Sequence, residues 1–348
     1  MTNESQMDSG DDEEALLPPT PDPLGVLSSA YPVVTQGELV WINTQQAAEL
    51  ARRWSQEQTI HAPAAPAWPA AYERYHFFDG TERSANWILA LDAMNFCFWA
   101  EPDQPRWRIV YKGETLNGYL AEAAALTRAV EDGLPLWDAA FLAQLSSETL
   151  AEIFRGEQPI PLFEQRLQNA REVGRVLLAQ FDGQFTNVIT AAEGNAVKLA
   201  QLITRHFSSF HDVALYRSLP VSFYKRAQLC VSDIQSAFKG QSWGRITAMD
   251  QLTAFADYKV PQALRHFGIL DYAPELARHV DSQKLIAEGS EEEIEIRAAT
   301  VWACELLRRQ LLTLDYPLTA AEIDQRLWLL AQNSADMRPY HRTRTQFY

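Results

Sequence analysis

The chain has 348 residues, 47% of them hydrophobic, and a formal net charge of −15. It can bury a large core, but its acidic balance argues against a broad nucleic-acid surface, because such surfaces need clustered Lys and Arg. Its three Cys residues favour no disulfide framework, and the absence of a membrane-length apolar run or a basic, apolar leader predicts a cytoplasmic protein.

The N-terminal residues 1–22 combine several prolines with seven acidic residues that precede the first basic residue, Arg52. Such a composition cannot bury enough apolar surface to offset the entropy of ordering, so a disordered acidic tail is predicted. Residues 23–348 are expected to form one compact unit. A first helix is expected over about 44–56, followed by a Pro- and Ala-rich connector over 62–71.

Three runs rich in aromatic and β-favouring residues follow one another between residues 75 and 113. They are YHFF, WILALDAMNFCFW and WRIVYK. Asp79-Gly80 separates the first two, and EPDQP at 101–105 separates the second and third. The pattern predicts a small antiparallel β-sheet over about 75–113.

Helical patterns dominate from Asn117 to about residue 335. Helices are expected up to about Gly133, from near Pro135 and Ser146, over about 162–182, and from Pro220 to about Phe238. Ser290 with Glu293 and Thr319 with Glu322 match the capping-box spacing. With no repeat and no long linker, the sequence predicts a mainly α-helical (α+β) fold carrying a small antiparallel sheet.

The first segment able to carry chemistry is DAMNFCFW, residues 92–99. Asn95 among aromatic residues could hydrogen-bond the edge of a flat ring that stacks on its neighbours. Alternatively, Phe96, Phe98 and Trp99 are core residues and Asn95 meets a backbone group, which is the commoner arrangement. The same two interpretations apply to HFFD at 76–79.

The second segment is YKRAQLCVSDI, residues 224–234. On one helix, Lys225, Gln228 and Ser232 fall three to four residues apart and can share a face. Lys225 and Arg226 together could hold a phosphate. The alternative is an ordinary solvated face with surface charges.

The third segment, residues 252–268, contains FADYKVPQAL. A helix is expected to end before Pro261 and another to begin with it, because the residue before a proline avoids helical geometry. Asp257 then lies at a helix junction, partly desolvated by Phe255 and Tyr258, where it could face a developing positive charge. It could equally cap the second helix, the commoner role of Asp at such a place.

Together these segments resemble the queuosine salvage family. The matching motifs, spread over about residues 30–335 in the family's order, are HFFDG (76–80), NFCFW (95–99), KRAQLCVSD (225–233), TAFADYKVPQAL (253–264), FGILDY (267–272) and EIEIRA (293–298). The resemblance implies a helical fold similar to the helix-hairpin-helix DNA glycosylases. It also implies hydrolysis of the N-glycosidic bond of queuosine 5′-phosphate, releasing queuine for salvage into tRNA modification, with no metal or other cofactor.

The resemblance also implies site residues, carried over by motif position. Asp257 is the implied catalytic carboxylate, and Lys225 the implied cation near the ribose phosphate. The implied substrate-binding residues are His76, Phe77, Asn95, Phe96, Phe98, Trp99, Arg226, Asp233 and Tyr258. The FADYKVPQAL hairpin has no glycine-rich turn for gripping a DNA backbone, which argues against duplex DNA as substrate. We expect a monomer that acts on a small molecule and binds neither nucleic acid stably nor membranes.

The implied chemistry suits these residue types. Bond cleavage leaves an oxocarbenium-like sugar and an electron-rich base, so both ends need stabilisation. Asp257 beneath C1′ would offset the positive charge or orient the attacking water. A 7-deazaguanine lacks the ring nitrogen that purine hydrolases commonly protonate, so help must act at its exocyclic oxygen or its N1 and N2 edge, where Asp233 could accept hydrogen bonds.

Two alternative functions remain open. A nucleic-acid base glycosylase would extrude a base from a polymer, and the basic stretch of Arg338, His341, Arg342 and Arg344 is the one feature that favours it. We expect that stretch to pack against the acidic body instead. A non-catalytic helical protein that binds a modified base would use Asp257 only as a cap.

Overall fold

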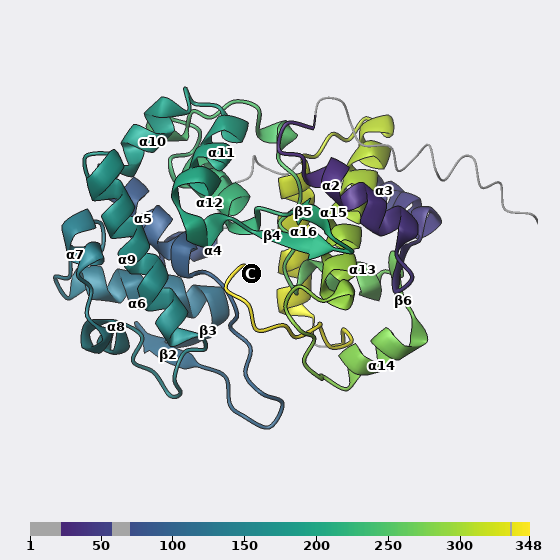
Figure 1. Ribbon diagram of the computed structural model, residues 1–348, viewed down its shortest axis with the longest axis horizontal. Helices are drawn as coiled ribbons and strands as arrows, with labels where there is room; N and C mark the ends of the chain where they lie inside the picture. Colours follow the sequence, from purple (N-terminus) through teal and green to yellow (C-terminus); the bar gives the residue numbers. More distant parts are fainter. Residues whose placement is uncertain (1–21, 58–69, 335) are drawn as a thin grey trace, which may run out of the picture.

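The computed structural model describes residues 22–57, 70–334 and 336–348 (Figure 1). Within these ranges the protein is mainly helical and contains three two-stranded antiparallel β-sheets. The predicted disordered tail lies outside the described residues except for Asp22, and so does most of the predicted connector. None of the described helices is both long and apolar enough to cross a membrane.

One half of the molecule, on the left of Figure 1, is built from the elements between α5 and α12. They are α5 (Glu82–Met94), β2 (Arg108–Tyr111), β3 (Glu114–Asn117), α6 (Gly118–Glu131), α7 (Ala139–Ala143), α8 (Ser147–Ile153), α9 (Phe163–Gln180), α10 (Phe185–Ala191), α11 (Ala196–His206) and α12 (Lys225–Ala237). Helix α5 contacts α9, α10 and α12 and is the central element of this half. Short segments flank it, namely α4 (Ala70–Glu73) and the 3₁₀ turns η1 (Ser208–Phe210), η2 (Ser242–Gly244) and η3 (Met249–Gln251).

The other half combines segments from both ends of the chain. They are α2 (Val26–Gln36), β1 (Val40–Ile42), α3 (Thr44–Glu57), α13 (Val260–His266), β6 (Leu270–Tyr272), α14 (Pro274–Asp281), α15 (Glu291–Thr313) and α16 (Ala320–Asn333). Strand β1 pairs with β6, with Trp41 opposite Asp271. A hairpin of β4 (Val213–Tyr216) and β5 (Leu219–Ser222) reaches from the first half to α15 and α2.

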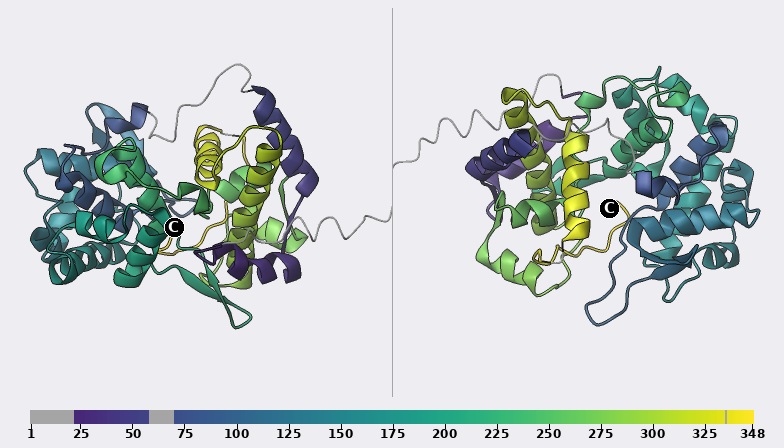
Figure 2. Two further views of the ribbon diagram at one scale, coloured as in Figure 1. Left: turned by 90° about the horizontal axis from the view of Figure 1, so that it is seen from above. Right: turned by 180° about the vertical axis from the view of Figure 1, so that it is seen from behind.

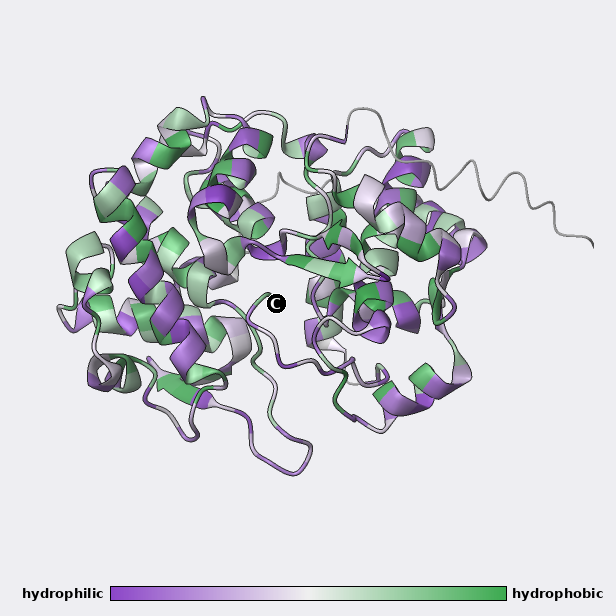
Figure 3. Ribbon diagram, in the orientation of Figure 1, coloured by the Kyte–Doolittle hydropathy of each residue, from purple (hydrophilic) through white to green (hydrophobic). Residues whose placement is uncertain are grey.

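Helix α15 belongs to both hydrophobic cores. Ile294, Val301 and Trp302 pack in the larger core, which joins the first half and α2, whereas Ile296 and Leu307 pack in the core of the second half. A helix buried on both sides shows little amphipathic pattern. Most other helices carry hydrophilic and hydrophobic residues on different faces, as the alternating colours in Figure 3 show.

The sheet predicted over 75–113 was wrong for most of its length. Residues 82–94 form helix α5, and only WRIVYK contributes a strand, β2, which pairs with β3. Every residue from Ser84 to Met94 is buried, so the run shows neither a helical nor a strand period. The helix is set by its start, where Thr81 accepts a hydrogen bond from the Arg83 N–H at 3.2 Å.

Several other expected boundaries can be compared directly. The helices predicted over 44–56 and 162–182 are confirmed as α3 and α9, and Thr319 forms the predicted capping box with Glu322. The helix expected from Pro220 was wrong, because Pro220 lies in β5 opposite Leu215 and α12 begins at Lys225. The helix expected to end just before Pro261 was wrong, because residues 252–257 form no helix. Pro261 itself lies in the first turn of α13, as predicted. The single-unit organisation and the likeness to DNA glycosylases stay predictions.

Candidate active site

A cavity lies where the two halves meet. The first half contributes residues 95–99, the start of α6 and one face of α12, and the second half contributes residues 255–259 and one face of α16. The C-terminal residues Tyr340 and Tyr348 complete the lining. The cavity therefore exists only when both halves and the C-terminal segment are in place.

One wall of the cavity is aromatic and is fixed by a buried arginine. Residues 95–99 leave α5 in an irregular path, with Cys97 at a φ of 44°. Arg166 of α9 donates to the carbonyl oxygens of Met94 and Phe96 and forms an ion pair with Glu122 at 3.0 Å. Its guanidinium also lies 4.4 Å from the Phe96 ring centre. The N–H donors of one planar guanidinium thus pair with backbone carbonyl oxygens that no neighbouring strand or helix turn would pair, and this fixes the path of the segment.

Asp257 is buried, with 7% of its surface exposed, and lines the cavity. Its Oδ1 accepts hydrogen bonds from the backbone N–H groups of Lys259 at 2.7 Å and Val260 at 2.8 Å. The extended chain before it is fixed by Gln228, whose side chain bonds both the backbone N–H and the hydroxyl of Thr253. Asp257 therefore binds two N–H groups at the start of α13 and faces the cavity at the same time.

The positive charge of Lys225 interacts electrostatically with two carboxylates, Asp257 and Asp324. Burial lowers the pKa of Lys225, and these carboxylates oppose the shift. Burial raises the pKa of Asp257. The positive charge of Lys225 and the hydrogen bonds from the Val260 and Lys259 N–H groups oppose that rise. Asp324 accepts a hydrogen bond from the Phe255 N–H at 2.8 Å, and burial together with Asp257 raises its pKa well above the usual range. The three buried groups line one cavity, and the charge of each affects the pKa of at least one of the others.

Asp324 was not among the site residues predicted from the sequence. On α16 it lies on the same face as Ala320, Leu327 and Ala331, all of them buried. An acidic residue inside the apolar stripe of an amphipathic helix was the signal that could have identified it.

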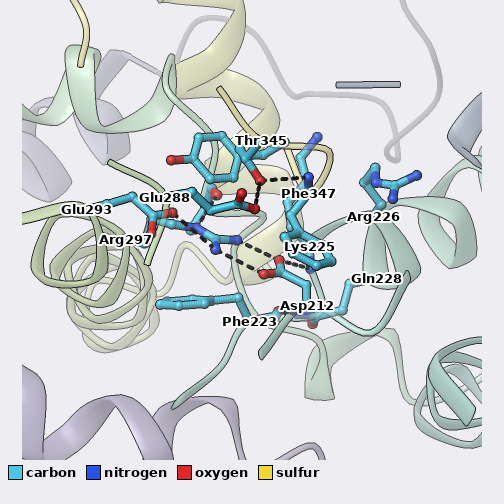
Figure 4. A network of polar contacts seen from close by, with 12 residues as sticks. Asp212, Phe223, Lys225, Arg226, Gln228, Glu288, Glu293, Arg297, Thr345 and Phe347 are labelled. Atoms are coloured by element: carbon cyan, nitrogen blue, oxygen red, sulfur yellow. Dashed lines mark hydrogen bonds and ion pairs between the residues drawn. The ribbon is translucent and has the colours of Figure 1, made fainter. Parts of the chain in front are cut away.

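Lys225 is positioned by a buried ion pair at the start of α12 (Figure 4). Asp212 binds the guanidinium of Arg297 through both oxygens, at 2.9 and 2.6 Å, and its Oδ2 also accepts from the backbone N–H of Lys225 at 3.2 Å. The guanidinium carbon lies 3.9 Å from the Phe223 ring centre. Because Arg297 belongs to α15, this pair links α12 to the helix shared by both cores.

Tyr119 contributes a hydroxyl group to the cavity and is oriented by His76. Nδ1 of His76 lies 2.8 Å from the carbonyl oxygen of Tyr72, so this nitrogen carries the proton. Nε2 is then the acceptor of the neutral ring, and the Tyr119 hydroxyl donates to it at 2.7 Å. Burial lowers the pKa of His76 to about 4, which keeps the ring neutral at physiological pH. Tyr119 therefore offers the cavity an acceptor.

A further carboxyl group lies behind the cavity wall near Asp233. Asp92 is fully buried, and burial together with the charge of Asp233 raises its pKa well above the usual range. Asp92 therefore favours its protonated form, while Asp233 lines the cavity. In the described ranges, no group of three or more His, Cys, Asp or Glu side chains is arranged to hold a metal ion.

The C-terminal segment runs between the two halves (Figures 1 and 2). The carbonyl oxygen of Arg342 accepts from the Ile286 N–H at 2.8 Å in one half, and that of Tyr348 accepts from the Cys97 N–H at 2.9 Å in the other. The guanidinium of Arg342 lies 4.4 Å from the Trp99 ring centre and 3.7 Å from a Glu101 oxygen. Arg344 also pairs with Glu101. The basic stretch packs against the body, as expected.

Comparison with known proteins assigns the chain to a family. Residues 75–348 match the family described as "Queuosine salvage protein". The chain is also 47% identical over 328 residues to the "Queuosine 5'-phosphate N-glycosylase/hydrolase" of Sphaerobacter thermophilus, covering 94% of this chain and 98% of that protein. The chain belongs to the queuosine salvage family.

More distant relatives with the same description support the assignment. The mouse protein is 34% identical over 302 residues, covering 82% of this chain and 89% of its own length. The Dictyostelium discoideum protein is 37% identical over 269 residues, covering 77% and 79%.

In this member of the family, the cavity gathers most of the side chains that the sequence singled out. Those that line it are Asn95, Phe96, Phe98, Trp99, Lys225, Asp233, Asp257 and Tyr258. They come from three separate segments of the chain, so the sequence order alone could not have shown that they converge.

Three of the predicted site residues do not line the cavity. His76 lies behind Tyr119, and the Phe77 ring stacks on Trp137 with ring centres 5.2 Å apart. Arg226 donates to the carbonyl oxygens of Asp92 at 2.9 Å and Ala93 at 2.7 Å, which directs it into the protein interior. Adjacent helix positions point about 100° apart, so Lys225 and Arg226 cannot both face one ligand.

Proposed function

We propose that this protein hydrolyses the N-glycosidic bond of queuosine 5′-phosphate and releases queuine for salvage into tRNA modification. The observation that carries the proposal is that Asp257 and Lys225, both buried, line one cavity with an aromatic wall, in a chain so similar to a protein described by this activity. The cavity lies inside an acidic protein, which suits a small nucleotide better than a nucleic-acid polymer.

In the proposed complex, the flat deazaguanine stacks on the aromatic side chains of residues 96–99 and on Tyr258. Stacking accommodates a flat ring but does little to fix how the ring is turned within its plane. Asn95, Asp233 and Tyr119 supply the directional contacts at the edge of the ring. The oxygen atoms of Asp233 and Tyr119 are acceptors, which match the N1 and N2 hydrogen-bond donors of the base.

Asp257 is the proposed catalytic carboxylate. Its Oδ1 is already engaged by two backbone N–H groups, so Oδ2 is the atom proposed to face C1′ of the ribose. There it stabilises the positive charge of the oxocarbenium-like transition state or orients the attacking water. Water adds its hydroxyl group to C1′, and its remaining proton ends on the nitrogen of the departing base.

Lys225 is proposed to keep Asp257 ionised inside a buried site. Burial alone favours the neutral carboxylic acid, which cannot offset a developing positive charge. The ammonium group of Lys225 opposes that shift. Its second partner, Asp324, holds the chain at Phe255 and so contributes to the placement of Asp257.

The alternative of a polymer-acting glycosylase has less support in the structure. The basic stretch that favoured it is engaged with Glu101 and Trp99. A non-catalytic binding protein would not need the buried acid–base cluster of Lys225, Asp257 and Asp324. Asp257 does accept hydrogen bonds from N–H groups at the start of α13, but the N-cap residue of that helix is Lys259.

The deciding experiment is incubation of the purified protein with queuosine 5′-phosphate, queuosine and queuosine-containing tRNA in parallel, with chromatographic detection of free queuine. The proposal predicts release from the nucleotide with many turnovers. Preferred release from tRNA would support the polymer alternative, and binding without any release would support the non-catalytic one. Either result would overturn the proposal.

A further inference from the structure

A second, polar pocket adjoins the cavity. The two share Arg106, Asn117, Lys259, Gln332 and Tyr340. The second pocket adds mainly polar side chains, among them Gln262, Gln283 and Ser334. A ligand in the cavity can therefore extend into a neighbouring space that has a different character from the aromatic wall.

Acidic side chains line only one of the two spaces. The cavity contains the carboxylates Asp233, Asp257 and Asp324 together with the cations Lys225, Arg106 and Lys259. Among the described residues that line the second pocket, none is acidic and three are cations: Arg106, Lys259 and Arg342. The part of the joint space that both pockets share is therefore bordered on one side by cations without carboxylates, and that side suits a negatively charged group of a ligand.

Two of these cations lie beside one tyrosine and form no ion pair with a carboxylate in the described part of the chain. Arg106 donates to the Tyr340 hydroxyl at 3.1 Å, and the Lys259 ammonium lies 5.2 Å from the centre of the same ring. Lys259 is held by the Gln262 side chain at 3.0 Å and the carbonyl oxygen of Ala331 at 2.9 Å, both of them neutral. Arg342, in contrast, lies 3.7 Å from a Glu101 oxygen.

Lys259 is largely buried beside both Asp257 and Arg106. Burial lowers its pKa to about 8, Asp257 opposes that shift, and Arg106 adds to it to a smaller extent. An anion between Lys259 and Arg106 would reverse this effect. Lys225 differs, because its charge already interacts with two carboxylates, Asp257 and Asp324.

We infer that Arg106 and Lys259 form the subsite for the 5′-phosphate of the substrate, with the Tyr340 hydroxyl as a further polar contact. This inference rests on the proposed function and moves the phosphate from Lys225, where the sequence placed it. A phosphate monoester carries close to two negative charges at neutral pH and accepts charge-assisted hydrogen bonds from Arg and Lys. Lys259 is two residues from Asp257, so binding the phosphate there positions the ribose against the catalytic carboxylate.

The test compares kcat/KM for queuosine 5′-phosphate and for unphosphorylated queuosine in Arg106→Gln, Lys259→Gln and Lys225→Met. Loss of one charge-assisted contact is expected to lower the nucleotide-to-nucleoside ratio about 10-fold or more in the first two variants. In Lys225→Met both substrates should lose activity equally. Arg108→Gln is the matched control, because Arg108 is exposed and lines neither pocket, and its ratio should stay at the wild-type value.

The outcomes separate the two proposals. If the wild-type protein releases queuine from neither substrate, the proposed function fails. If it releases queuine but Arg106→Gln and Lys259→Gln leave the ratio unchanged, or if only Lys225→Met lowers it, the phosphate subsite is overturned while the proposed function stands. Arg106 is exposed, so its substitution does not endanger the fold, and unchanged thermal unfolding of each variant confirms this.

Discussion

The hydroxyl oxygen of Tyr119 lies 2.7 Å from Nε2 of His76. Because Nδ1 of His76 must donate to the Tyr72 carbonyl, the Tyr119 proton is committed to His76 and its oxygen faces the cavity as an acceptor. A hydroxyl in an aromatic cavity would otherwise act as donor or acceptor indifferently. The pair thus gives the cavity a defined preference for a ligand N–H group.

The first prediction concerns this preference. Tyr119→Phe removes the acceptor and leaves the ring, so kcat/KM for queuosine 5′-phosphate should fall about 10-fold, as for loss of one buried hydrogen bond. A His76→Phe variant should show a similar loss although His76 does not line the cavity. Steady-state kinetics on both variants measure the effect, and wild-type kinetics in Tyr119→Phe would contradict the assigned role.

The second prediction concerns the proposed catalytic carboxylate. Asp257→Asn should lower kcat by about 10² to 10⁴-fold, because the charge proposed to face C1′ is lost. The Asn side-chain oxygen can still accept from the Lys259 and Val260 N–H groups, so the start of α13 should keep these hydrogen bonds and the melting temperature should change little. Asp250→Asn, at an exposed position, is the control. Near-normal turnover in Asp257→Asn would eliminate the assignment.

The third prediction concerns pH. Burial raises the pKa of Asp257, so its charged form is lost as the pH falls through that raised value, and activity should decline on the acid side above the usual range of an Asp. Lys225 opposes the shift, and the neighbouring Asp324 is the other titratable group of the cluster. In Lys225→Met the acid limb of kcat/KM should therefore move to higher pH. A limb that stays in place, or moves to lower pH, would argue against the electrostatic role of Lys225.

The fourth prediction concerns stability. Arg297→Met leaves the Asp212 carboxylate buried without its partner, so the free energy of unfolding should fall by about 3 to 5 kcal/mol. Arg155→Met breaks exposed ion pairs with Asp132 and Glu152 and should cost less than about 1 kcal/mol. Denaturant unfolding monitored by circular dichroism measures both values. Equal effects would show that the buried pair does not link α12 to α15 as described.

The sequence predicted long amphipathic helices and helix caps better than buried segments. Helices α3 and α9 have one apolar face each, and their period is visible in the sequence. Helix α5 is buried on all sides, so its apolar run was taken for a strand. Pro220 misled the prediction for a different reason, because it fits the first turn of a helix and also a two-stranded hairpin, where its missing N–H costs little.

For the site, residue types and motif positions indicated which segments matter but not which side chains point inward. Lys225 and Arg226 were assigned alike, yet only Lys225 reaches the cavity. Asp324 and Arg106 lie outside the motifs that were singled out, and only the packing of α16 and of the chain near β2 brings them to the cavity. Such convergence depends on the tertiary fold, which local patterns do not encode.

The path of the C-terminal segment also bears on how the protein matures. A ribosome delivers Lys225 and Asp257 long before Tyr340 and Tyr348, which line the same cavity. While the chain is still being synthesised, the cavity therefore lacks part of its lining, and the proposed phosphate subsite lacks Tyr340. If the cavity is the active site as proposed, hydrolysis is expected only after residues 340–348 have left the exit tunnel and settled between the two halves.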